Sequence, residues 1–211
     1  VSWFRKDIEN IIENVQRLGG ASLAFVTPVN YPTGRLQGWE FEIRQRMGRL
    51  DERLDGLSLG ANVTLIDSTV TLPEEDAADL ADPSVGAPIT QRDATGAPEY
   101  LYNLFLTYDL AATGTTFSVF WTAQGDTLVE GAAVNEGNFV PNVYATDFGT
   151  LNMSLSQRIG EHVRITFRAR NLTNPEIQEV FRSEFTGPDQ LKTSFTRGID
   201  YSLGVSANFT F

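Results

Sequence analysis

The chain has 211 residues, 41% of them hydrophobic, and a mean hydropathy of −0.18. No run approaches the roughly 18 consecutive apolar residues that a membrane-spanning helix needs, which excludes a helical membrane protein. The lack of cysteine excludes disulfides, zinc–thiolate sites and cysteine nucleophiles. A net charge of −11, from 16 basic and 27 acidic residues, argues against nucleic acid as a partner.

Eight segments alternate apolar and polar residues with the period of two that is typical of β-strands. The first, from Val1 to about Ile12, is the least regular. Alternate residues of a strand point to the same face, and residues that share a face are said here to share a parity. Trp3 has one parity while Phe4 and Ile8 have the other, which predicts a β-bulge. The others are, in chain order, Arg35 to Met47, Leu57 to about Thr71, Tyr100 to Leu110, Thr115 to about Gln124 (with Phe120 as an exception to the alternation), Phe148 to about Gln157, His162 to Arg170, and Tyr201 to Phe211.

The last strand shows the alternation most clearly. Its polar parity holds only small hydroxyl, amide and glycine groups, and no charge follows Asp200. A soluble sandwich usually carries charges on its outer face, whereas a strand between lipid and a wet lumen has the pattern seen here. The apolar parity consists of Tyr201, Leu203, Val205, Ala207, Phe209 and Phe211.

The connections between the predicted strands alternate in length. The short ones are Gly48 to Asp55, Ala111 to Gly114 and Arg158 to Glu161. The long ones are Glu13 to Gly34, Leu72 to Glu99, Gly125 to Asp147 and Asn171 to Asp200. Short turns on one rim and long loops on the other describe an antiparallel up-and-down transmembrane β-barrel, with short periplasmic turns and long extracellular loops.

The lumen parity of two strands carries the charge. These residues are Glu40, Glu42, Arg44 and Arg46 on one strand, and Arg164, Arg168 and Arg170 on another. A narrow barrel filled by side chains would need to pair each of them, whereas a wide, wet or plugged barrel accommodates them readily. Two roles are open: contact with substrate, or pairing with one another and with a plug.

At this point the chain resembles the C-terminal third of a TonB-dependent outer-membrane receptor. Nearly the whole chain takes part in the resemblance. The segments that carry it are Trp3 to Ile8, Gly34 to Glu40, Leu57 to Asn62, Arg168 to Pro175 and Gly198 to Phe211. The opening residues have neither an initiator methionine nor the shape of a signal peptide. We therefore expect a piece of a longer protein.

The resemblance implies an all-β fold in which residues 1–211 are the last eight strands of a barrel of about 22. It implies a plug domain absent from this chain, integral location in the bacterial outer membrane, and uptake of a scarce bulky nutrient with energy supplied through TonB. The ligand class would be an iron–siderophore complex, cobalamin or a glycan. The partners implied are outer-membrane lipid, the plug, TonB and the barrel-assembly machinery. The assembly signal would comprise Tyr201, Val205, Ala207, Phe209 and Phe211.

Two other classes of protein remain as alternatives. A freestanding eight-stranded outer-membrane barrel with an adhesive or structural role is one, since eight strands can close alone. A soluble β-sandwich binding module is the other, and it would bury the apolar parity between two sheets.

Motifs for catalysis and metal binding are weak. The single histidine, His162, falls at a short periplasmic turn, so a Ser-His-Asp site at the extracellular rim is excluded and no enzyme activity or catalytic residue is predicted. No cofactor is predicted either, with one reservation. The acidic loop residues Glu74, Glu75, Asp76 and Asp79 are hard oxygen ligands suited to Ca²⁺, although such a run is more often a solvated surface.

Overall fold

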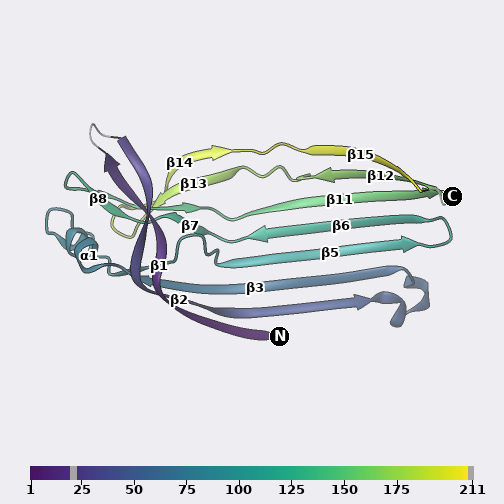
Figure 1. The fold of residues 1–211 in the computed structure, drawn as a ribbon, viewed down its shortest axis with the longest axis horizontal. Helices are drawn as coiled ribbons and strands as arrows, with labels where there is room; N and C mark the ends of the chain where they lie inside the picture. Colours follow the sequence, from purple (N-terminus) through teal and green to yellow (C-terminus); the bar gives the residue numbers. More distant parts are fainter. Residues whose placement is uncertain (20–22, 209–211) are drawn as a thin grey trace.

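The structure, a computed structural model, describes all residues except 20–22 and 209–211. Eight long strands lie side by side in one sheet (Figure 1). They are β1 (Ser2–Gly19), β2 (Leu23–Arg46), β3 (Leu57–Thr71), β5 (Tyr100–Leu110), β6 (Thr115–Gln124), β11 (Phe148–Ile159), β12 (Val163–Arg170) and β15 (Asp200–Ala207). The sequence prediction is confirmed in full for β3, β5 and β6, whose bounds it matches.

Each strand of this sheet pairs with its neighbour along the chain. The order is β1-β2-β3-β5-β6-β11-β12-β15, and every pairing is antiparallel. The two-residue strand β4 (Gln91–Arg92) adds to the loop end of β3. Within the described part of the chain, β1 and β15 are opposite edges and do not pair with each other. The open sheet favours a segment of a larger barrel over a freestanding eight-stranded one.

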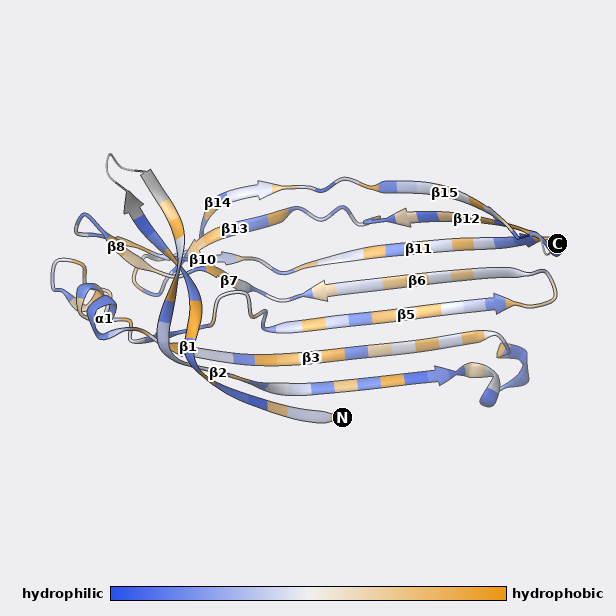
Figure 2. Ribbon diagram, viewed as in Figure 1, coloured by the Kyte–Doolittle hydropathy of each residue, from blue (hydrophilic) through white to orange (hydrophobic). Residues whose placement is uncertain are grey.

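The pairing register brings the apolar parities of neighbouring strands onto one face. Leu104 of β5 lies opposite Ala61 of β3 and Trp121 of β6. Phe167 of β12 lies opposite Leu203 of β15, and Leu203 is 71% exposed. Figure 2 shows the alternation of apolar and polar residues along these strands. A soluble sandwich would bury this face against a second sheet, so that alternative is wrong. None of the helices described is long and apolar enough to cross a membrane.

The segment from Glu13 to Gly34 corrects the sequence prediction of a long loop. β1 and β2 remain paired through it, from Glu13 opposite Val29 to Gly19 opposite Leu23. In Figure 1 this hairpin crosses the end of the sheet where the other long connections gather. Pro28 and Pro32 both lie within β2, since proline is tolerated on a strand that needs no N–H at that position. Each arm supplies the other with hydrogen-bond partners, which sequence periodicity alone does not show.

Strand β1 changes face at Asn10. Asn10 has a φ of 54°, in the left-handed region that asparagine enters more readily than most residues. Glu9, before it, is exposed, whereas Val15, of the same parity, is 1% exposed in the core. The pairing register is the same on both sides of Asn10. The irregularity predicted in this strand is therefore a change of direction without an inserted residue, so the predicted bulge is wrong.

The remaining connections contain short elements. The short turn after β2, predicted to be periplasmic, holds η1 (Met47–Arg49) and η2 (Glu52–Leu54). At the opposite end lie α1 (Glu74–Ala81), β7 (Thr127–Glu130), β8 (Ala133–Asn135), β9 (Asn138–Val140), β10 (Asn142–Ala145), β13 (Ile177–Arg182) and β14 (Gln190–Phe195). β14-β13-β10-β7 form a second sheet, and β8 pairs with β9. The long connections are thus folded structure and not open loops.

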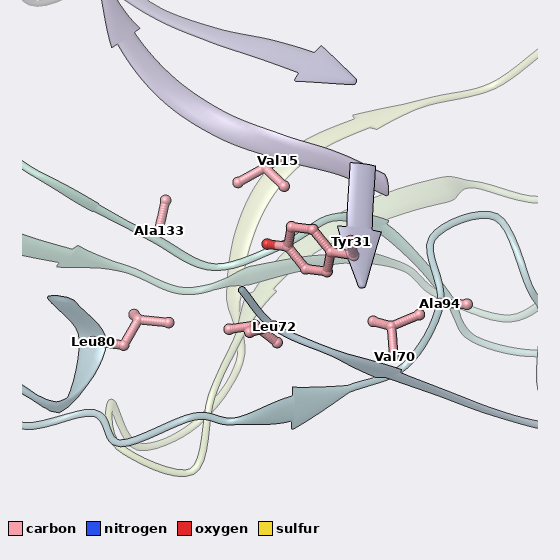
Figure 3. Packing of buried hydrophobic residues seen from close by; sticks show 7 residues of the cluster. All are labelled: Val15, Tyr31, Val70, Leu72, Leu80, Ala94 and Ala133. Atoms are coloured by element: carbon pink, nitrogen blue, oxygen red, sulfur yellow. The ribbon is translucent and has the colours of Figure 1, made fainter. Parts of the chain in front are cut away.

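The buried apolar core lies among these connections. Figure 3 shows side chains from β1, β2, β3, α1 and the segments around them converging on one cluster. Its members are Val15, Tyr31, Val70, Leu72, Leu80, Ala94 and Ala133. The wall strands, by contrast, expose their apolar face, as expected where lipid replaces a protein core. This end of the sheet, predicted to be extracellular and called the extracellular end below, is therefore the part of the chain that folds like a soluble domain.

Candidate functional site

The charged residues of β2 share the inner face, opposite the apolar one. Glu40 pairs across the sheet with Thr64 of β3, and Arg44 lies opposite Gly60. Arg44 Nε contacts Glu42 Oε1 at 2.7 Å, but both side chains are more than half exposed, so this ion pair adds little stability. The fourth member, Arg46, has no ion-pair partner among the described residues. The structure therefore places these four residues on one face of β2, and their contact with substrate or plug stays a prediction.

The arginines of β12 form a second inner-face group. Arg164 Nη1 donates to Ser156 Oγ at 3.1 Å, and Arg170 Nη1 lies 3.6 Å from Asp200 Oδ2. Arg168 has no ion-pair partner in the part of the chain that the structure describes. Strands β3, β5, β6 and β11 separate this group from the one on β2, and no described ion pair joins the two. The unpaired cations face the space that a closed barrel would enclose.

An aromatic patch on the same inner face was not predicted. Phe105 covers Gly60, where a Cβ atom would overlap the phenyl ring. The Phe105 ring is 6.5 Å from that of Phe120, and the Arg44 guanidinium lies 5.9 Å from the Phe105 centroid. The available signal was Phe120, the apolar residue on the polar parity of its strand. The lumen thus offers an apolar surface beside a cation.

The extracellular end holds a buried ion pair, also missed by sequence reasoning. Arg92 Nη2 is 3.5 Å from Glu13 Oε2, and the two side chains are only 2% and 1% exposed. The Arg92 guanidinium also lies 5.0 Å from the Tyr31 ring centroid. Within the described residues, no guanidinium nitrogen of Arg92 makes a hydrogen bond. The only sequence signal was that Arg92 is a single base in an acidic connection, which gave no indication of its partner.

Burial sets the protonation of this cluster. Desolvation raises the pKa of Glu13, against the opposing effects of the Thr95 backbone N–H, which donates to Glu13 Oε2 at 3.0 Å, and of the Arg92 charge. Burial likewise raises the pKa of Tyr31 to about 12, although the Arg92 charge opposes it. The Tyr31 hydroxyl donates to Asp76 Oδ2 at 3.1 Å.

The alkaline titration of Tyr31 is a test of this burial. The folded pKa of about 12 exceeds the ordinary tyrosine pKa of 10.0, so neutral Tyr31 favours the folded state. Its stabilising contribution is complete below pH 10 and disappears as the pH rises through about 12. When the ionisation of tyrosines is followed by ultraviolet absorbance, we expect Tyr31→Phe in the intact protein to remove one tyrosine that ionises only near pH 12. If the number of tyrosines that ionise near pH 12 is unchanged by the substitution, the buried placement of Tyr31 is contradicted.

Further ion pairs tie the long connections together. Arg182 contacts Asp126 at 2.6 Å and Asp189 at 2.8 Å, and Lys192 Nζ contacts Glu130 Oε1 at 2.6 Å. Beside Arg182, a cavity of about 270 Å³ lies between the connection that contains β4 and strands β10 and β13. The extracellular end is thus a cross-linked cap with polar recesses.

The proposed calcium ligands lie in and beside this cap. Glu74, Glu75, Asp76 and Asp79 all fall on α1. Asp76 is engaged by Tyr31 and by Arg17 Nη2, which lies 3.2 Å from Asp76 Oδ1. Among the described residues, no group of three or more acidic or histidine side chains is arranged to hold a metal ion. Calcium binding stays a prediction to which this arrangement adds no support.

The remaining predicted residues lie at the strand ends. Tyr201, Val205 and Ala207 of the predicted assembly signal are on the exposed outer face of β15, whereas Phe209 and Phe211 lie outside the described residues. His162 is exposed at the turn before β12, with Nδ1 3.0 Å from the carbonyl oxygen of Asn208.

Comparison with known proteins agrees with this geometry. The family model described as "TonB dependent receptor-like, beta-barrel" matches residues 1–172. No curated protein matches the sequence.

Several solved structures share the fold. The unliganded ferric citrate transporter FecA has a TM-score of 0.59 at 13% identity, over 83% of this chain and 24% of its own. The ferric enterobactin receptor PfeA of Pseudomonas aeruginosa (G324V) has a TM-score of 0.58 at 16% identity, over 98% of this chain and 28% of its own. The iron transporter FrpB of Neisseria meningitidis has a TM-score of 0.57 at 14% identity, over 98% of this chain and 27% of its own. This chain thus spans about a quarter of each receptor. It belongs to the TonB-dependent receptor β-barrel family, a family of transport receptors that are integral to the bacterial outer membrane.

Proposed function

We propose that residues 1–211 form the C-terminal segment of the barrel of an active importer, with the plug domain in a part of the protein outside this chain. The open order of eight strands supports this assignment, because further strands are needed to complete a wall. Eight of about 22 strands would be just over a third of a barrel, which agrees with about a quarter of each solved receptor once a plug domain adds to the receptor's length.

The imported compound would be a scarce bulky nutrient of the iron–siderophore, cobalamin or glycan type, taken up with energy supplied through TonB. The observation that carries this proposal is the polar, charged inner face that runs along the wall strands, because a lumen filled only by its own side chains would not leave such charges unpaired. Iron chelates are the first compounds to test, because the similar solved receptors are described as ferric or iron transporters.

Collapse of the inner-membrane proton gradient tests active import. Cells that produce the intact protein, and matched cells that lack it, are supplied with radiolabelled ferric citrate, ferric enterobactin or cobalamin. With a protonophore, we expect receptor-dependent uptake to fall to the level of the cells without receptor, while surface binding persists. Uptake of a small solute through passive porins is the control and should not change. Receptor-dependent uptake that continues without the gradient would indicate passive diffusion.

The inner-face cations are proposed to contact the plug. Arg46 and Arg168 have no ion-pair partner among the described residues, and a charge enclosed in a wall without a partner is costly. Acidic side chains on the plug would neutralise them. Substrate contact is the second role, and the aromatic patch of Phe105 and Phe120 beside Arg44 favours it for that strand.

The C-terminal residues are proposed as the signal read by the barrel-assembly machinery. We expect deletion of Phe211 from the intact protein to lower its amount in the outer membrane several-fold, because an aromatic end on the outer parity would be lost. Immunoblots of outer-membrane fractions measure it, with deletion of the tip of an extracellular connection as the control. An unchanged amount would count against the assembly role.

A further inference from the structure

Two arginines lie side by side on the inner face of the wall, at the end of the sheet predicted to be periplasmic. Arg158, near the end of β11, is directly opposite Arg164 of β12. Like charges in such positions on neighbouring strands repel each other and destabilise the pairing. Arg164 Nη1 donates to Ser156 Oγ at 3.1 Å. Within the part of the chain that the structure describes, however, neither arginine makes an ion pair.

A hollow of about 190 Å³ adjoins this arginine pair and opens on the inner face. Its lining consists of Asp109, Ala111, Gly114, Thr116, Arg158 and Arg164. The Thr116 hydroxyl donates to Asp109 Oδ1 at 3.3 Å, so this carboxylate is engaged by a neutral partner. The volume equals that of about six water molecules, which is enough for one anionic group of a larger solute. The two cations therefore border a space that an anion can enter.

The inner faces of β11, β12 and β15 lead from the extracellular end to this hollow. Their residues from Thr150 onward are hydroxyl, amide, glycine or charged. They are Thr150, Asn152, Ser154, Ser156 and Arg158 of β11, Arg164, Thr166, Arg168 and Arg170 of β12, and Asp200, Ser202, Gly204 and Ser206 of β15. The hydroxyls bond across the strands, as Ser156 Oγ and Thr166 Oγ1 do at 3.2 Å. With four arginines and one aspartate, this sector has a net positive charge.

The inner face of β1, β2, β3 and β5 has a more apolar surface. Phe4 lies against Gly38, as Phe105 lies against Gly60, and an added Cβ atom would overlap each ring. Leu101, on the same face, is 37% exposed. Apolar side chains that point into a lumen favour a protein cover, whereas hydroxyl groups and arginines are well solvated by water. In a plugged barrel, the sector of β11, β12 and β15 is thus the side that can stay wet.

We propose that the imported compound is an anion that leaves the lumen along β11, β12 and β15, with the Arg158–Arg164 pair as its last contact before the periplasm. This inference rests on the proposed import function and selects anionic iron chelates over uncharged compounds. A positively charged wall concentrates anions. In the hollow, an anionic group offsets the repulsion between the two arginines and accepts hydrogen bonds from their guanidinium groups. Arg168, proposed above to contact the plug, becomes available to the anion when the plug moves.

Uptake of compounds that differ in charge tests the proposal. The probes are radiolabelled ferric citrate and ferric enterobactin, which are anions, and cobalamin and a ferric tris-hydroxamate, which carry no net charge. They are supplied to cells that produce the intact protein and to matched cells that lack it. We expect receptor-dependent uptake of an anionic probe to exceed that of either neutral probe by about tenfold or more, because the field of the lumen favours negative charge.

Substitution of the arginine pair tests the position of the contact. Arg158→Gln with Arg164→Gln should lower uptake of the anionic probe about tenfold, because both charges beside the hollow are lost. Binding at the cell surface should not change, since the pair lies at the opposite end of the wall. Arg158→Lys with Arg164→Lys keeps the charge and should retain most of the uptake. Arg49→Gln with Arg53→Gln, on η1 and η2 at the same end of the sheet, is the matched control and should import like the wild type.

Asp109→Asn tests the hollow in the opposite direction. It removes the carboxylate from the lining, so uptake of the anionic probe should rise about two- to threefold, a gain that faulty assembly does not produce. Uptake is compared at equal amounts of receptor in the outer membrane, measured by immunoblot. Wild-type uptake by the double glutamine variant of Arg158 and Arg164, or no gain from Asp109→Asn, would overturn the proposal. Gradient-dependent uptake of the neutral probes alone would also overturn it but leave active import standing, whereas uptake that ignores the gradient would contradict active import itself.

Discussion

Leu104→Arg is expected to lower the free energy of unfolding of the intact receptor by about 2–4 kcal/mol, the cost of arginine on the lipid face near the bilayer midplane. Leu104 lies near the middle of the outer face of β5 and is 44% exposed. Its cross-strand neighbours are Ala61 and Trp121, so no acidic group lies beside it to offset the charge. Urea titration of receptor refolded in lipid vesicles measures the loss.

The matched control is the adjacent residue on the same strand. Asn103 points to the inner face, between Asn62 of β3 and Thr122 of β6. Asn103→Arg should leave the urea midpoint nearly unchanged, because water and polar groups surround the new charge. Equal losses from the two variants would show that the two faces meet the same solvent, and the membrane orientation of the wall would fail.

Loss of the Glu13 charge should open the extracellular cap. We expect Glu13→Gln to lower the local opening free energy of the cap by about 3 kcal/mol, since removal of one partner leaves the buried Arg92 charge uncompensated. The guanidinium lies directly against Gly131, where a Cβ atom would overlap it. Hydrogen exchange at the Thr95 amide, which donates to Glu13, reports the opening directly.

Two further variants make this result specific. Glu9→Gln, on the same strand but exposed, should leave exchange of the cap unchanged. Arg92→Met added to Glu13→Gln should restore most of the protection, because an apolar side chain needs no countercharge. Exchange as slow in Glu13→Gln as in the wild type would show that the ion pair does not hold the cap.

The wall could be predicted because its signal is local. The bounds of β3, β5 and β6 follow from alternation alone, and the family match and pairing register agree with the predicted lipid face. The hairpin of β1 and β2 could not be predicted in the same way. Its outer half contains Pro28 and Pro32, and pairing with the opposite arm keeps it extended. Alternation fails there because, beyond Asn10, the hairpin faces packed protein on one side.

Sequence by itself determined which side chains of the wall meet lipid and which meet the lumen, since adjacent residues of a strand point to opposite faces whatever their neighbours are. Tertiary structure alone decided the cap. The approach of Arg92 to Glu13, the hydrogen bond from Tyr31 to Asp76 and the ion pair between Arg182 and Asp126 all join residues distant in the chain. Such contacts depend on how connections fold back over the sheet, and no periodicity in the sequence encodes that path.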